Sequence, residues 1–248
     1  PFGIVRGEPD KDGNWKWTSV VGDQERDGAK YTFGIDPERT RSGAANLTEF
    51  DGYLYIGEYN DEEIAVERML FDNDFTFMNL NFEQPVNLYR MDPDENIELV
   101  VGDKDQMFPE GSLSGLDSGF GSNENQYVWK MVVYDEKLYV GTYDASSFLL
   151  PLDEYMNDEE TSEEWKKEVD GYVEKLCDDY QGVPESAGIC AEYLDKAVFG
   201  FDLYVTEDGV HFTKITDNGF GDPYNHGCRA FGVTDEGLFV GTANPFYG

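Results

Sequence analysis

The chain has 248 residues, of which 40% are hydrophobic and 15% aromatic, enough to bury one sizeable core or two small ones. Asp and Glu number 52 against 18 Lys and Arg, and a surface with a formal net charge of −34 repels nucleic acid and anionic lipid. The sequence contains no run of about 18 apolar residues, so it predicts no membrane-spanning helix.

The first predicted element is a β-hairpin at residues 4–23, with an acidic turn at its centre. Asp10 and Asp12 follow Glu8 at alternate positions and precede Gly13. Ligands alternate in this way in a calcium-binding loop, because alternation points successive oxygens inward. The closing bidentate Glu of such a loop is missing, and Asp is common in tight turns. A structural calcium site and a simple turn both stay open.

Three copies of one pattern follow, each made of two strands joined by a tight turn. The strands are rich in Tyr, Phe and Val, as β pairing prefers. Aligned on the glycine of the second strand, the copies keep register without gaps over roughly 20 residues, which indicates an internal repeat. The aligned residues are Gly57, Gly141 and Gly241; Asp51, Asp135 and Asp235; Arg41, Asn125 and Asn225; and the pairs Phe33–Gly34, Phe120–Gly121 and Phe220–Gly221.

A second hairpin follows each of the first two copies, at residues 87–103 and 201–218. The hairpin at 4–23 has the same form. Four antiparallel strands per repeat, joined by tight turns, are typical of a β-propeller blade, so we predict an all-β fold of the β-propeller class. Asp92, Asp94 and Asn96, in the turn of the 87–103 hairpin, form a second candidate calcium loop with the same alternative of a simple turn.

The turn of the 201–218 hairpin carries Thr206-Glu207-Asp208-Gly209, followed by Phe212. It resembles the Asp-box of sialidase-type propellers, in which the Asp holds its own turn. Asp12-Gly13-Asn14-Trp15 matches in part, and the turn at 92–96 departs from the pattern. The chain thus resembles bacterial secreted β-propeller repeat proteins. The resemblance implies the fold but no activity, because sialidases need an arginine cluster and the arginines here are few and scattered.

We predict one β-propeller domain, or part of one, over residues 1–248. It comprises repeats at about 44–103, 127–217 and 228–248, the hairpin at 4–23 and a helical insertion at about 145–197. The chain thus starts and ends inside a blade, and joining its ends leaves fewer blades than the usual minimum of about four. We expect a fragment of a longer propeller, or a second chain or missing segment that completes the ring. A further blade hidden in the insertions is disfavoured, since neither insertion repeats the pattern.

The long connections are all expected on one face of the propeller and the tight turns on the other. The long ones lie at about 24–43, 59–86, 104–126 and 143–198. Binding sites usually lie on loops that a rigid scaffold positions. Helices are expected within two of these connections, at 161–179, where Thr161 and Glu164 form a capping box, and at 61–70. The apolar stripe of the 161–179 helix either packs on the propeller or binds a partner.

Cysteine usage favours an oxidising compartment. Cys177 and Cys190 bracket a loop rich in Gly, Pro and Ser, and we predict a disulfide between them. Cys228 is expected to be buried in a strand, and the absence of a Cys-x-x-Cys pair excludes a zinc ribbon. Together with an N-terminus that lacks Met, this predicts a secreted or cell-surface protein.

The candidate ligand-binding residues lie where the repeated strands begin and end on the long-loop face. They are Arg41, Asn125 and Asn225 at the beginnings, Asn60, Asp144 and Asn244 at the ends, and Trp129, His226 and Arg229 close by. Amide, carboxylate and guanidinium groups could hydrogen-bond a sugar while aromatic rings stack on it. The alternative is that these repeated polar residues hydrogen-bond neighbouring blades.

No catalytic motif is present: the chain has two histidines and no G-x-S-x-G, H-E-x-x-H or Walker sequence. We therefore expect a non-catalytic extracellular protein that binds a glycan or a protein, such as a host protein, and that needs no cofactor beyond the structural calcium. The alternative is a glycan-active hydrolase or lyase that uses carboxylates on the long-loop face. With 52 acidic residues, no particular pair can be chosen from the sequence.

Overall fold

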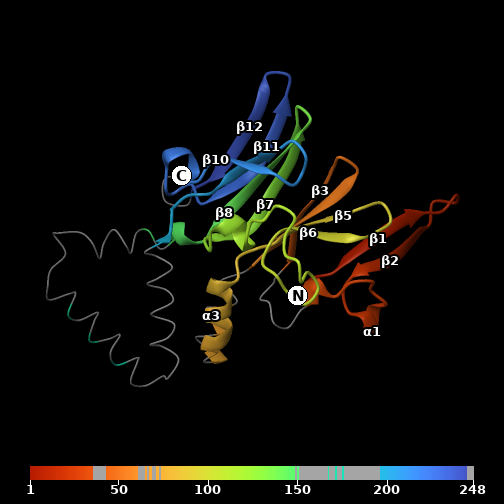
Figure 1. Ribbon diagram of the computed structural model, residues 1–248, viewed down its shortest axis with the longest axis horizontal. Helices are drawn as coiled ribbons and strands as arrows, with labels where there is room; N and C mark the ends of the chain where they lie inside the picture. The colour runs from red at the N-terminus through yellow and green to blue at the C-terminus, as the bar shows by residue number, and fades with distance from the viewer. Residues whose placement is uncertain are drawn as a thin grey trace.

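The computed structural model describes residues 1–35, 43–60, 74–148 and 196–244, with a few single positions between these ranges (Figure 1). Arg41, Cys177 and Cys190 lie outside the described residues. The predicted helices at 61–70 and 161–179 also lie outside them, apart from single helical positions.

The described residues form twelve strands, all paired antiparallel. The strands are β1 (Ile4–Pro9), β2 (Trp15–Val21), β3 (Gly43–Phe50), β4 (Tyr53–Tyr59), β5 (Leu88–Met91), β6 (Ile97–Val101), β7 (Asn125–Tyr134), β8 (Lys137–Asp144), β9 (Leu203–Thr206), β10 (Phe212–Thr216), β11 (Gly227–Thr234) and β12 (Gly237–Ala243). Short 3-10 turns lie at Phe33–Ile35, Ser118–Gly121, Ser146–Phe148 and Gly219–Gly221.

The strands pair in the order of the sequence repeat. β3 to β6 form one four-stranded meander and β7 to β10 form another. β11 and β12 form a hairpin, and β1 and β2 form a separate two-stranded sheet. The pairs Tyr59–Tyr127 and Tyr143–Gly227 join the meanders and the last hairpin into one curled sheet. The predicted all-β fold and its strand pairs are therefore confirmed.

Two apolar cores lie on the two faces of the β3–β6 meander. Tyr55 belongs to the core shared with β7 to β9, which also contains Leu138 and Tyr204. The next residue, Ile56, belongs to the core shared with the β1–β2 hairpin. Successive residues of a strand point to opposite faces, so a sheet covered on both faces needs apolar residues at consecutive positions. This explains why Leu54–Ile56 and Leu138–Val140 read as apolar runs rather than as alternating patterns.

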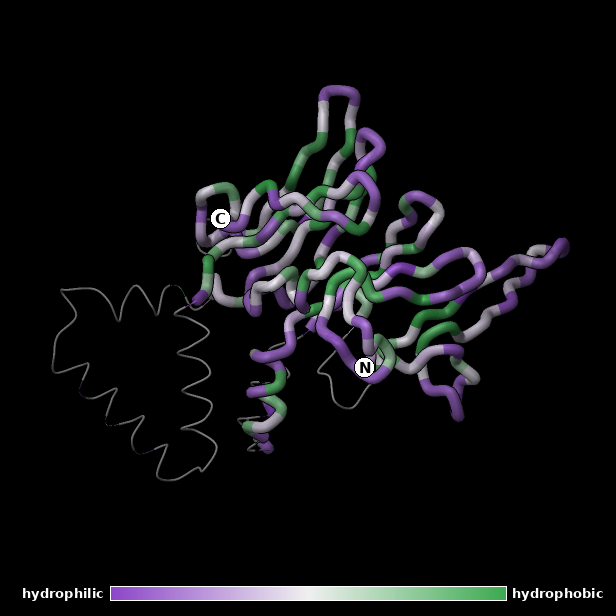
Figure 2. The backbone as a smooth tube through the Cα atoms, viewed as in Figure 1, coloured by the Kyte–Doolittle hydropathy of each residue, from purple (hydrophilic) through white to green (hydrophobic). Residues whose placement is uncertain are grey.

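The tight turns after β3, β7 and β11 point to one end of the molecule, and helix α3 (Phe75–Glu83) lies at the other (Figure 1). The turns are hydrophilic, and the apolar residues gather along the strands (Figure 2). Asp74 begins α3, since its side chain accepts a hydrogen bond from the Phe77 amide at 3.0 Å. No helix among the described residues has the length and apolar character to span a membrane.

The repeated glycines stand where neighbouring meanders come closest. A Cβ added at Gly57 would lie 2.5 Å from Val128, and one at Gly141 would lie 2.4 Å from Cys228. At Gly241 the nearest atom would be the Cβ of Ala230 at 3.4 Å. Glycine is therefore required at the first two positions for packing rather than for a special backbone conformation.

We expect Gly57→Ala and Gly141→Ala to lower the free energy of unfolding by about 1–3 kcal/mol each, because the added methyl overpacks a closed core. Gly241→Ala, the matched substitution at the open position, should change it by less than about 0.5 kcal/mol. Urea denaturation of the three variants measures the difference. Equal destabilisation by all three would contradict this packing.

Candidate functional site

The three inner strands β3, β7 and β11 lie side by side, and each carries a β-bulge at the same repeat position. At this position the residue without a partner in the pairing is Ala45 in β3, Trp129 in β7 and Arg229 in β11. β7 has a second such residue, Gln126, nearer its start. A bulge bends its strand and re-aims the side chain, and bulges are common next to binding sites. The repeat therefore presents one small, one aromatic and one cationic side chain at equivalent places.

Trp129 and Arg229 are in contact, because the guanidinium lies over the indole at 4.9 Å from the ring centroid. Trp129 is half-buried and Arg229 is exposed. The indole packs on Gly227, where an added Cβ would lie 2.0 Å from the ring. The missing side chain at Gly227 thus makes the space in which the indole lies.

Further rings surround Trp129. Tyr127 and Tyr143 stack with their centroids 4.2 Å apart, and Tyr59 meets Tyr127 edge-on at 5.0 Å. The His226 ring lies 5.4 Å from Tyr143 and 5.9 Å from Trp129. We call these five residues, Tyr59, Tyr127, Trp129, Tyr143 and His226, the aromatic cluster. It lies where the strands of neighbouring repeats meet, at the end opposite the tight turns.

His226 is 7% exposed, and its burial lowers the pKa of the imidazole to about 4. The ring is therefore neutral at neutral pH. Its backbone holds the cluster to β8, because the Asp144 amide donates to the His226 carbonyl oxygen at 2.7 Å.

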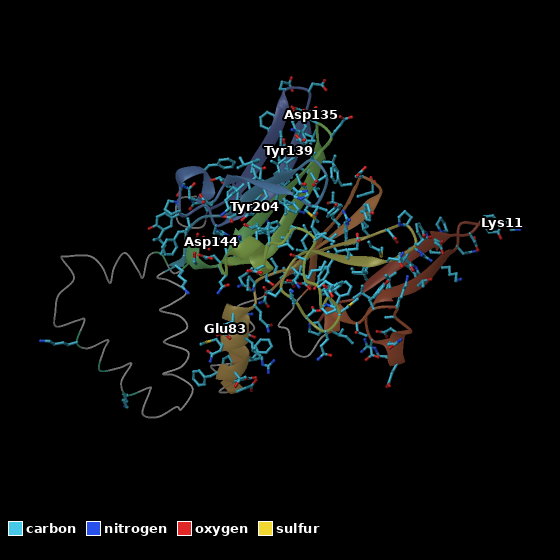
Figure 3. All side chains as sticks on the ribbon, in the orientation of Figure 1. Lys11, Glu83, Asp135, Tyr139, Asp144 and Tyr204 are labelled. Atoms are coloured by element: carbon cyan, nitrogen blue, oxygen red, sulfur yellow. The ribbon has the colours of Figure 1, made fainter. Side chains whose placement is uncertain are left out.

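Asp144 lies at the end of β8, far from Asp135 in the turn before that strand (Figure 3). Its carboxylate accepts hydrogen bonds from the Ser146 amide at 2.7 Å, the Ser147 hydroxyl at 2.6 Å and the Gly200 amide. The side chain is 1% exposed, and burial raises its pKa to about 6, although these hydrogen bonds act in the opposite direction. Asp144 thus fixes the place where the chain returns after the 145–197 insertion.

Glu124 also hydrogen-bonds the segment that returns after the insertion, near the residue that Asp144 holds. Its carboxylate accepts from the Val198 amide at 3.0 Å, and burial raises its pKa above the ordinary value. Two buried carboxylates therefore hold the returning segment at Val198 and Gly200.

The aligned asparagines stabilise equivalent turns. The Asn125 amide donates to the Gly119 carbonyl oxygen at 2.9 Å, and the Asn225 amide donates to the Gly219 carbonyl oxygen at 2.9 Å. Asn125 also donates to the Asp202 carboxylate at 2.9 Å. In both turns the phenylalanine has a positive φ, 60° at Phe120 and 62° at Phe220. Such a conformation is strained for a bulky residue and needs surrounding support.

Asn60 and Asn244 also make hydrogen bonds within the protein. The Asn60 amide donates to the Gln126 side-chain oxygen at 3.0 Å, and the Asn244 amide donates to the Asp222 carboxylate at 3.1 Å. Of the predicted ligand-binding residues, the structure therefore brings Trp129, His226 and Arg229 together. Asn60, Asn125, Asp144, Asn225 and Asn244 hydrogen-bond the strand ends and connections, and their role in binding a ligand stays a prediction.

The sequence reasoning missed the tyrosines of the aromatic cluster. Tyr59 and Tyr143 each stand two residues after a repeated glycine, so the repeat alignment contained this signal. It also missed α3 and the short helix α1 (Gln24–Asp27). The α3 sequence FTFMNLNFE has no amphipathic period that would indicate a helix.

Both candidate calcium loops are closed by hydrogen bonds that the carboxylate of their first aspartate accepts from backbone amides. Asp10 accepts from the Asp12 and Asn14 amides at 2.8 and 2.9 Å, and Asp92 accepts from the Asn96 amide at 2.7 Å. Within the described ranges, no group of three or more His, Cys, Asp or Glu residues could hold a metal ion. Calcium stays a prediction. Cys228 is buried with a free thiol, as expected.

No family model, no characterised protein and no solved structure matches the chain. The chemistry of the site is therefore argued from its geometry alone.

His226 and Asp144 should oppose each other in the pH dependence of stability. A histidine in the unfolded chain binds a proton below pH 6.5, whereas buried His226 binds one only near pH 4. The contribution of His226 to the free energy of unfolding is therefore lost as the pH falls from about 6.5 to about 4. The pKa of Asp144 is raised in the folded protein. The contribution of Asp144 to the free energy of unfolding is therefore present below pH 3.8 and is lost as the pH rises through about 6.

We expect His226→Gln, which copies Gln126 of the preceding repeat, to remove the His226 contribution. The difference in unfolding free energy between wild type and variant should shrink on the order of 2 kcal/mol from pH 6.5 to pH 4. Chemical denaturation across this range measures it. A difference that stays constant with pH would show that His226 is not buried in its neutral form.

We expect Asn125→Ala to lower the free energy of unfolding by about 1–3 kcal/mol, because it removes two buried hydrogen bonds, one to the Gly119 carbonyl oxygen and one to the Asp202 carboxylate. Asn123→Ala removes an exposed amide two residues away and serves as the matched control. Thermal denaturation compares the two. Equal stability of the variants would show that Asn125 is not a structural residue.

Proposed function

We propose that the chain is a non-catalytic β-propeller protein that binds a glycan at the aromatic cluster and Arg229. The observation that carries the proposal is the contact of Trp129 with Arg229 at equivalent bulges of neighbouring inner strands. An aromatic ring can cover the apolar face of a sugar, and a guanidinium offers several donors in a fixed geometry to its hydroxyl groups. Sites of this kind combine aromatic walls with a few placed polar groups.

The strand arrangement supports the proposal of a β-propeller. The first strands of the two meanders, β3 and β7, lie next to each other, as the first strands of neighbouring propeller blades do. The turn at 206–212 also fits the resemblance to bacterial secreted propellers, because Asp208 accepts from the Val210 and His211 amides at 2.9 and 2.8 Å. Secretion, and the Cys177–Cys190 disulfide that would accompany it, belong to the same proposal.

The charge of the chain limits the class of glycan that we propose as the ligand. A formal net charge of −34 repels a polyanionic glycan, so we propose a neutral oligosaccharide, free or displayed on a glycoprotein. Arg229 then acts as a hydrogen-bond donor rather than as a counter-ion.

The glycan-active enzyme is the second candidate. Burial raises the pKa of Glu124 and Asp144, as a general acid requires. Asp144, however, is 1% exposed, and Ser146, Ser147 and Gly200 hydrogen-bond its carboxylate. Binding is therefore the better supported function.

The test is an array of neutral and acidic oligosaccharides, followed by calorimetry on the best neutral ligand. We expect Trp129→Ala to weaken binding about tenfold, the equivalent of 1.4 kcal/mol, because stacking is lost. Trp129→Phe should retain most of the affinity. Tyr134→Ala removes an aromatic side chain from the tight-turn end of β7 and should have no effect.

Turnover of a bound oligosaccharide that disappears in Glu124→Gln would establish the enzyme instead. Binding of a protein in which enzymatic deglycosylation changes nothing would replace the glycan by a protein ligand. Wild-type affinity in Trp129→Ala would reject the aromatic cluster as the site.

A further inference from the structure

The three inner strands β3, β7 and β11 share a repeat position that lies at the aromatic cluster. The residues at this position, each with its partner on the following strand, are Gly43 with Tyr59, Tyr127 with Tyr143, and Gly227 with Ala243. Only the middle pair has two rings, and these stack with their centroids 4.2 Å apart. In the other two pairs the inner strand contributes glycine.

An aromatic ring lies against each of these two glycines. A Cβ added at Gly43 would overlap the Tyr59 ring, and a Cβ added at Gly227 would overlap the Trp129 ring. Neither glycine has a positive φ, so neither is needed for its backbone conformation. Glycine is needed at both positions because a ring occupies the place of the side chain.

The two rings reach their glycines from different strands. Tyr59 is the partner of Gly43 in the β3–β4 ladder. Ala243, the partner of Gly227, has no ring, and Trp129 reaches Gly227 from the bulge of β7 instead. The chain thus places one ring at this position of every inner strand, although the three rings come from three different kinds of position.

Tyr59, Tyr127 and Trp129 therefore form a row across the inner strands, which we call the aromatic row. The centroids of Tyr59 and Tyr127 are 5.0 Å apart, and those of Tyr127 and Trp129 are 5.8 Å apart. The outer two rings both stand nearly perpendicular to Tyr127, at 76° and 84°. All three side chains are half-buried, whereas Tyr143 and His226 beside them are buried. The row extends from Arg229 beside Trp129 to Tyr59 on the first meander.

We propose that the aromatic row binds a linear β-1,4-linked oligosaccharide, with one sugar at Trp129 and another at Tyr59. This inference rests on the proposed glycan site and adds Tyr59 to it as a second stacking position. A site that used Trp129 and Arg229 alone would need only one terminal sugar. The row of rings across three strands fits a longer ligand.

The chemistry of the ligand follows from the shape and charge of the row. In β-1,4-linked glucose, mannose or xylose both linking bonds leave each sugar ring equatorially, so successive rings form a flat ribbon with apolar faces. Such a face can lie on several aromatic side chains in succession. These sugars are uncharged, as the formal net charge of −34 favours. Arg229 donates to hydroxyl groups at the Trp129 end.

The length of the site is tested by calorimetry with β-1,4-linked glucose, mannose and xylose, each as a series from one to four units. We expect at least one series to bind, with an affinity that rises about tenfold or more from the monosaccharide to the tetrasaccharide, because a second stacking contact is added. Equal affinity along the series would show a site for a single sugar.

Tyr59 is tested in the same series. We expect Tyr59→Ala to weaken binding of the tetrasaccharide about tenfold and binding of the monosaccharide less than about twofold, because only the longer ligand reaches Tyr59. Tyr59→Phe keeps the ring and should bind like wild type. Trp129→Ala should weaken binding of both ligands.

Gly43→Ala provides a second variant, since it leaves Tyr59 in the chain and displaces its ring. It should weaken tetrasaccharide binding as Tyr59→Ala does, and Gly227→Ala, the equivalent change under Trp129, should weaken binding of both ligands. Each variant is measured at a temperature at which thermal denaturation shows it folded.

Three results would overturn the proposal: no binding of any of the three series, equal affinity for one and four units, or wild-type tetrasaccharide binding in both Tyr59→Ala and Gly43→Ala. If Trp129→Ala still weakens binding of the best ligand of the array, the proposed glycan site stands without its second position. Wild-type affinity in Trp129→Ala would reject the site itself.

Discussion

The β3–β6 and β7–β10 meanders are each apolar on both faces, so each must have a neighbour on both sides. Tyr55 and Ile56, consecutive residues of β4, belong to two different cores. This requirement makes the chain a series in which every meander buries the next, as repeat proteins do when one unit cannot bury its own apolar surface. Phe239 in β12 and Val5 in β1 are exposed, since among the described residues β12 pairs with β11 alone and β1 with β2 alone.

Close packing of the inner strands also determines where a large side chain can reach the site. Gly57 packs against Val128 and Gly141 packs against Cys228, so these positions have no room for a side chain. A bulge leaves one residue outside the hydrogen-bonded ladder, so its side chain can be large. Trp129 is such a bulge residue, and Gly227 provides the space for its indole ring.

The abundant acid of the chain serves two purposes that depend on burial. Most carboxylates in the part of the chain that the structure describes are exposed and solvated by water, where they contribute charge and solubility. Asp144 and Glu124 are buried, and amide or hydroxyl donors compensate part of the cost of desolvation. Because both hold the segment at 198–200, the long insertion after β8 leaves from and returns to a rigid place beside the aromatic cluster.

The sequence by itself determined the strands, the tight turns and the repeat register, because turn chemistry and strand composition act over a few neighbouring residues. It could not predict α3, whose sequence lacks a helical period. Only the tertiary structure decided that Asn125 hydrogen-bonds Asp202, that Asp144 accepts from the Gly200 amide and that Trp129 contacts Arg229. These contacts join residues from separate repeats or connections, and the fold that brings them together depends on how whole sheets pack rather than on local preference.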